Sequence, residues 1–194
     1  MKTSTEHALA KVPEVTLGFW IIKIAATTLG ETGGDAVSMS MNLGYLVGTG
    51  IFAVIFLAAV VAQIKAKSFH PFLYWATIIA TTTVGTTLAD FADRSLGIGY
   101  AGGSSLLLGL LLGSLFVWYR TLGSVSVNTV SSPKAEAFYW LTIMFSQTLG
   151  TALGDWMADT AGLRHTGAAV VFSGLLTLVV AAYYWPGVAR TLLF

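Results

Sequence analysis

The sequence predicts an all-α integral membrane protein with about six transmembrane helices, arranged as three parallel two-helix repeats. Of its 194 residues, 55% are hydrophobic and only 10% are charged, whereas soluble domains carry about 25% charged residues. The mean hydropathy is +0.76. The sequence lacks the alternating strands of a membrane barrel, so helices are the spanning elements. We therefore expect the lipid bilayer to be the main partner of this chain.

Six apolar segments are long enough to cross a bilayer, which takes about 20 residues of helix. Pro13, Pro71 and Pro133 stand near the start of the first, third and fifth segments, where a helix tolerates proline. Ser132 is a candidate N-cap. Tryptophans and tyrosines such as Tyr74 near the segment ends are expected to form an aromatic belt at the membrane interfaces. The expected spans are 15–34, 44–63, 71–88, 102–119, 136–153 and 166–184.

The first, third and fifth spans share one motif, which runs 15 residues from a tryptophan to an aspartate. Its copies are 20–35, 75–90 and 140–155, and each has threonine at the eighth and glycine at the tenth position after the tryptophan. Because each repeat contributes two spans, successive repeats enter the membrane in the same orientation. We expect one transmembrane domain over 1–194, with repeat units at about 13–64, 71–120 and 133–186, and with the three motifs on one side of the membrane.

Basic residues indicate which side that is. Only Arg94 and Arg164 fall in the loops after the motifs, whereas seven basic residues fall in the termini and the remaining loops. By the positive-inside rule, both termini are cytoplasmic and the motifs lie near the outer face of a bacterial inner membrane. The seven residues are Lys2, Lys11, Lys65, Lys67, Arg120, Lys134 and Arg190.

The stretch Thr-Thr-Leu-Gly-Glu-Thr-Gly-Gly-Asp at 27–35 resembles a bacterial membrane-protein family defined by a repeat of unknown function. Members are often called uncharacterised membrane-anchored proteins, and 147–155 looks like a later copy of the repeat. Family members usually carry four copies, so the resemblance implies that the last is missing here. Pro186 has the spacing expected for a fourth repeat, and 187–194 would be its start. Either the chain is a fragment or the natural protein has lost that unit.

Polar residues recur on one face of each motif helix, at spacings i, i+4 and i+7. Small residues between them favour close helix packing. Around a common axis, three carboxylates would converge at the outer mouth and suit a hard cation such as Mg²⁺, Ca²⁺ or Mn²⁺. The alternative is that each threonine bonds to its own helix and each aspartate ends it. The expected path residues are Thr28, Glu31, Thr32, Asp35, Thr83, Thr87, Asp90, Thr148 and Asp155, with Asp35, Asp90 and Asp155 as candidate metal ligands.

Lys23 and Glu31 distinguish the first repeat from the others. A lysine deep in a membrane helix usually faces a partner or a water-filled cavity. The two residues share one face, two helical turns apart, which is about 12 Å. One interpretation is a charged gate or a coupling pair; the other is that Lys23 reaches the interface or neutralises a neighbouring carboxylate. Met39 and Met41 could admit a soft metal, but interfacial packing explains them as well.

The predicted function is a small transporter or channel for cations. The alternative is a non-transporting scaffold or partner subunit whose polar stripes serve helix packing. No catalytic or nucleotide-binding motif is present, so we expect no enzyme. The chain has no cysteine, which excludes disulfides and thiolate metal sites. No cofactor is expected beyond a bound divalent cation, and no nucleic acid is an expected partner. A homo-oligomer is compatible with the sequence, which leaves the oligomeric state open.

Overall fold

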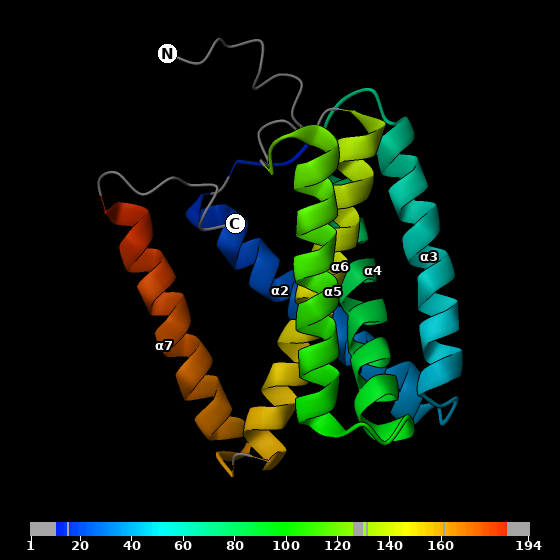
Figure 1. The fold of residues 1–194 in the computed structure, drawn as a ribbon, viewed down its shortest axis with the longest axis vertical. Helices are drawn as coiled ribbons and strands as arrows, with labels where there is room; N and C mark the ends of the chain where they lie inside the picture. Colours follow the sequence, from blue (N-terminus) through cyan, green and yellow to red (C-terminus); the bar gives the residue numbers. More distant parts are fainter. Residues whose placement is uncertain (1–10, 15, 126–129, 131, 161, 186–194) are drawn as a thin grey trace.

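The computed structural model describes residues 11–14, 16–125, 130, 132–160 and 162–185, and this part of the chain is helical throughout its regular structure. Three π-helical segments continue the motif helices: η1 (Ala36–Ser40), η2 (Phe91–Ser95) and η4 (Trp156–Thr160). The predicted start of a fourth repeat lies outside the described residues. Figure 1 shows the six α-helices, which are α2 (Leu17–Asp35), α3 (Tyr45–Lys65), α4 (Pro71–Asp90), α5 (Gly99–Leu122), α6 (Pro133–Asp155) and α7 (Arg164–Tyr184).

The prediction of a helical integral membrane protein is confirmed. Within the described residues, four helical stretches are long and apolar enough to cross a bilayer: α3, α4 together with η2, α5 and α7. The other two helices, α2 and α6, are long enough, but they carry more polar and charged residues. They include Lys23 and Glu31 in α2, and Glu136 and Gln147 in α6. The two helices least suited to lipid are thus motif helices.

Local capping explains where the motif helices begin. Pro71 and Pro133 occupy the first turns of α4 and α6, as predicted. The hydroxyl of Ser132 accepts a hydrogen bond from the Ala135 amide at 3.3 Å, which confirms the predicted N-cap. The prediction for Pro13 was wrong. The first helix begins at Leu17, because the Thr16 hydroxyl caps it by accepting from the Phe19 amide.

The repeats pack in a head-to-tail order. Motif helix α2 packs against α4, and α4 packs against α6; in the described part of the chain, no comparable packing joins α2 to α6. The second helices of the first two repeats follow the same order, because α3 packs on α4 and α5 packs on α6. Among the described residues, no motif helix follows α7. It contacts mainly η4 and stands apart from the bundle over most of its length (Figure 1).

Glycines and threonines of the motif form the contacts between motif helices. A Cβ atom added to Gly30 of α2 would lie 2.8 Å from the Thr82 Cβ and from the Ile79 carbonyl oxygen of α4. A Cβ atom at Gly85 of α4 would lie 2.9 Å from the Thr148 Oγ1 of α6. The motif glycine of one repeat therefore allows the backbone of the next motif helix to approach closely.

Part of the predicted aromatic belt is instead a packed core, at the end of the bundle where α4 and α6 begin. Tyr74, Tyr139, Trp140 and Trp118 are all buried between helices. The hydroxyls of Tyr74 and Tyr139 are 2.7 Å apart and hydrogen-bond across the α4–α6 contact. Because the phenol groups have each other as partners, these rings can leave the membrane interface.

A buried ion pair lies close to this aromatic core. The ammonium of Lys11 is 2.7 Å from the Glu136 carboxylate, whose side chain is 2% exposed. Lys11 also donates to the backbone carbonyls of Gln63 and Ile64 at the end of α3. Lys11 thus connects the segment before α2 to the end of the first repeat and to the third repeat.

Candidate functional site

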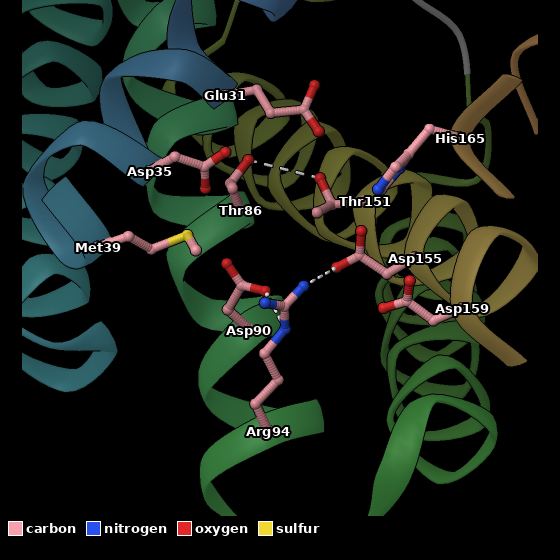
Figure 2. Close-up of a pocket in the computed structure, with 10 residues that line it drawn as sticks. All are labelled: Glu31, Asp35, Met39, Thr86, Asp90, Arg94, Thr151, Asp155, Asp159 and His165. Atoms are coloured by element: carbon pink, nitrogen blue, oxygen red, sulfur yellow. Dashed lines mark hydrogen bonds and ion pairs between the residues drawn. The ribbon is translucent and has the colours of Figure 1, made fainter.

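A polar cavity of about 440 Å³ lies at the end of the bundle where the motif helices pass into their π-helical segments. All three repeats contribute to its wall, and α7 adds one histidine (Figure 2). The lining residues are Glu31, Asp35, Met39, Thr86, Asp90, Arg94, Thr151, Asp155, Asp159 and His165.

Nine of these ten residues occupy equivalent places in the three repeats. With the motif tryptophans Trp20, Trp75 and Trp140 as position zero, each repeat contributes positions 11, 15 and 19. Position 11 is Glu31, Thr86 or Thr151; position 15 is Asp35, Asp90 or Asp155; position 19 is Met39, Arg94 or Asp159. The cavity is therefore built by the internal repeat itself, and we call it the motif cavity.

The π-helical segments help to align these positions. Positions 11 and 15 belong to the α-helix, whereas position 19 belongs to the π segment in every repeat. A π turn closes i→i+5 hydrogen bonds and is wider than an α turn, and such turns occur frequently at functional sites. Residues four places apart share a helix face, so position 19 stays on the cavity side beyond the aspartate.

Five carboxylates and one guanidinium line the motif cavity. Arg94 lies 3.0 Å from Asp90 through its Nε atom and 3.2 Å from Asp155 through a terminal nitrogen. Its other terminal nitrogen donates to the Tyr45 hydroxyl at 3.3 Å. Arg94 thereby joins all three repeats, but it partners only two of the five acids. The formal charge of the lining remains strongly negative.

The four predicted acidic residues do meet in one place. Glu31, Asp35, Asp90 and Asp155 all line the motif cavity (Figure 2). Among the described residues, however, no group of three His, Asp or Glu side chains is arranged to hold a metal ion. Arg94 pairs with two of the three candidate ligands instead. Divalent metal binding at Asp35, Asp90 and Asp155 stays a prediction.

The predicted threonines lie elsewhere, and this corrects the register of the predicted stripe. Thr83, Thr87 and Thr148 are buried, and each hydroxyl donates to a carbonyl of its own helix. Thr28 and Thr32 are exposed on α2. The threonines that do line the cavity are Thr86 and Thr151, whose hydroxyl oxygens are 3.5 Å apart.

Lys23 and Glu31 do not form a pair. Lys23 is partly buried and is not among the residues that line the cavity. No carboxylate of the described residues lies within ion-pair distance of its ammonium. Glu31 belongs to the motif cavity. Of the two methionines, Met39 lines the cavity, and Met41 is 65% exposed.

Six lining residues were not among the path residues expected from the sequence. They are Met39, Thr86, Arg94, Thr151, Asp159 and His165. A signal for most of them was present. Steps of four in both directions from each motif aspartate reach positions 11 and 19 in all three repeats. His165 carried no such signal, because it lies outside the motif and enters the cavity from the start of α7.

Comparison with known proteins supports the repeat. The family model described as Repeat of Unknown Function (DUF347) matches three times, at residues 18–69, 73–124 and 138–188. No curated protein and no solved structure matches the chain. The three matches cover most of the sequence, and each contains one motif helix and the helix that follows it. The chain therefore belongs to the membrane-protein family defined by this repeat of unknown function.

Proposed function

We propose that the protein is a small membrane transporter or channel for cations and that the motif cavity is where the cation enters or binds. One observation carries the proposal: three repeats place five carboxylates and a single guanidinium around one cavity. Clefts lined by one sign of charge concentrate ions of the opposite sign, and rings of acidic side chains select cations in channels.

Arg94 would act as a tethered counter-ion in this site. Its guanidinium pairs with both Asp90 and Asp155. A cation that enters would compete with Arg94 for the same oxygens, and Glu31 and Asp35 on the facing helix would supply further oxygens. Carboxylate and hydroxyl oxygens favour hard cations, including Mg²⁺, Ca²⁺ and Mn²⁺.

We further propose that the cavity faces the outside of a bacterial inner membrane. The motif ends of α2, α4 and α6 lie together at the lower end of the bundle, and the first described residues lie toward the other end (Figure 1). Lys11, Lys65, Arg120 and Lys134 occupy that other end, next to the connections that lead into or out of helices. By the positive-inside rule, the basic end is cytoplasmic.

Ion flux into proteoliposomes tests the proposal. Flux of K⁺, Mg²⁺ and Mn²⁺ is measured in separate assays for the wild type, Asp90→Asn and Asp155→Asn, against protein-free liposomes. Asp93→Asn is the matched control, because Asp93 precedes Arg94 on the same segment but packs against Gly103 outside the cavity lining. We expect flux of at least one cation, reduced about tenfold or more by either cavity substitution, which corresponds to about 1.4 kcal/mol.

Arg94→Gln provides the opposite perturbation in the same assay. If Arg94 competes with the cation, its removal raises cation affinity or leak flux instead of abolishing transport. The proposal fails if no cation moves faster than in protein-free liposomes. It also fails if Asp90→Asn and Asp155→Asn transport as well as Asp93→Asn does.

A scaffold or partner subunit is the second candidate, and one observation favours it. Thr83, Thr87 and Thr148 serve helix packing, because they are buried and bond to their own helices. A scaffold needs no cation in the motif cavity. Thermal unfolding with and without Mg²⁺ or Mn²⁺ separates the two candidates: the transporter predicts a shift that disappears in Asp90→Asn, and the scaffold predicts none.

A further inference from the structure

A further set of equivalent residues lies at position 25 of each repeat, counted from the motif tryptophan. They are Tyr45, Tyr100 and His165, and each is the first or second residue of the second helix of its repeat. His165 lines the motif cavity itself, whereas the two tyrosines are not among the lining residues. Both tyrosines are partly buried. Any effect of the tyrosines on the cavity must therefore act through the residues that line it.

Each tyrosine reaches the side chain at position 19 of the following repeat. The Tyr45 hydroxyl accepts a hydrogen bond from a terminal nitrogen of Arg94 at 3.3 Å, and the central carbon of that guanidinium lies 6.0 Å from the centre of the Tyr45 ring. The Tyr100 hydroxyl donates a hydrogen bond to the Oδ2 atom of Asp159 at 2.7 Å. The same contact is therefore made twice, once from the first repeat to the second and once from the second to the third.

The packing of the helices explains why this contact recurs. Helix α3 touches η2 as well as α4, and α5 touches η4 as well as α6. The second helix of one repeat thus lies against the π-helical segment of the next, which carries position 19. A phenol hydroxyl can accept a hydrogen bond from a guanidinium and can also donate one to a carboxylate. Tyrosine at position 25 can therefore hold a side chain of either charge at position 19.

The two partners have opposite charges, so the same contact has opposite consequences for a cation in the motif cavity. Arg94 is paired with Asp90 and Asp155, so a contact that holds Arg94 there opposes a cation that needs the same oxygens. Asp159 is itself an acid of the cavity wall. The Tyr100 hydroxyl bonds to only one of its two oxygens, and hydrogen-bond partners that orient a carboxylate ligand strengthen its binding of a metal ion.

We propose that Tyr45 and Tyr100 are positioning residues of the motif cavity and that they change its cation affinity in opposite directions. The proposal rests on the proposed function, because it takes this cavity as the place where a cation binds. Tyr45 holds the competing guanidinium of Arg94 against the acids and so lowers the affinity. Tyr100 holds the Asp159 carboxylate in one orientation, with its other oxygen left for the cation, and so raises the affinity.

Removing one hydroxyl group at a time tests the proposal. The wild type, Tyr45→Phe and Tyr100→Phe are titrated calorimetrically with K⁺, Mg²⁺ and Mn²⁺ in separate experiments, after circular dichroism has verified that each variant is folded. Tyr119→Phe is the matched control, because Tyr119 is 57% exposed at the opposite end of α5 from Tyr100. We expect Tyr45→Phe to bind the cation about threefold more tightly than the wild type. Tyr100→Phe should bind it about tenfold more weakly.

Chains that lack the position 19 partner separate positioning from a general effect on the structure. Tyr45→Phe should leave the cation affinity of an Arg94→Gln chain unchanged, and Tyr100→Phe should leave that of an Asp159→Asn chain unchanged.

The proposal is overturned if both tyrosine variants shift the affinity in the same direction, if neither differs from Tyr119→Phe, or if the shifts persist without the partners. In each of these cases the wild type still binds a cation, so the proposed function stands. A wild type that binds none of the three cations removes the proposed function, and the role of the two tyrosines with it.

Discussion

Replacing Gly85 by alanine should weaken the contact between α4 and α6, although alanine is the better helix former. The new Cβ atom would lie 2.9 Å from the Thr148 Oγ1 and 3.1 Å from the Thr148 backbone nitrogen. Both distances are shorter than a normal carbon contact, and the backbone nitrogen cannot rotate away as a side chain can. The two helices must therefore separate slightly, or the contact remains strained.

The magnitude follows from two opposing effects. Overfilling a packed interface costs about 1–3 kcal/mol, and alanine regains about 1 kcal/mol over glycine inside a helix. Because a backbone atom is involved, we expect a net loss of about 1–2 kcal/mol for Gly85→Ala. Gly30→Ala should behave alike, since its Cβ atom would lie 2.8 Å from the Ile79 carbonyl oxygen. Gly150→Ala meets no atom within 4 Å and should not destabilise the single chain.

The free energy of unfolding is measured by titration with sodium dodecyl sulfate in mixed micelles, with helicity followed by circular dichroism. Dilution keeps the chain monomeric, so that residue 150 reports only on the single chain. The expected order of stability is Gly150→Ala at or above the wild type, with Gly30→Ala and Gly85→Ala below it. If Gly85→Ala proves as stable as Gly150→Ala, the head-to-tail packing described above is refuted.

Two further predictions concern the opposite end of the bundle. Tyr74→Phe and Tyr139→Phe should each lower the free energy of unfolding by about 1 kcal/mol. The double substitution should lower it little more than either one, because a hydrogen bond joins the two hydroxyls. A double-mutant cycle in the same unfolding assay checks this, and additive losses would contradict it. Lys11→Met should destabilise by about 3–5 kcal/mol, because it leaves the Glu136 carboxylate buried without its partner. Lys11→Met combined with Glu136→Met should recover most of that loss, and an equal loss in the double variant would show that the charge pair is not the cause.

Much of the fold could be predicted, because the length of the apolar segments and the residues at helix starts can be read directly from the local sequence of each repeat. Apolar length fixes the spans, and Pro71, Pro133 and Ser132 fix helix starts. The first helix start was missed, because Thr16 caps α2 while Pro13 only precedes it. The head-to-tail order of the repeats was not predictable, since identical motifs give no indication of which face contacts which neighbour.

The acidic part of the site was predictable, and the hydroxyl part was not. Asp35, Asp90 and Asp155 mark the same end of three like-oriented helices, so their convergence follows from the repeat. On an ideal helix, the threonines at position 8 and those at position 11 lie about equally close to the face that carries the aspartate at position 15. In the structure, the motif glycines pack closely on the next motif helix, so Thr83 and Thr148 lie buried in the contact between helices. The positions of some aromatic residues were also predicted wrongly. The hydroxyls of Tyr74 and Tyr139 hydrogen-bond to each other, so these side chains can be buried without the hydrogen-bond partners that the membrane interface offers.

The central claim is that positions 11, 15 and 19 of three repeats line one acidic cavity, while position 8 of the second and third repeats is buried between helices. Cysteine accessibility tests it most directly in this cysteine-free chain. Glu31→Cys and Thr151→Cys should react with a membrane-impermeant cationic thiosulfonate from one side only, and faster than with its anionic counterpart, whereas the buried Thr83→Cys and Thr148→Cys should stay unreactive. Reaction at residues 83 and 148, together with no reaction at residues 31 and 151, would contradict the account.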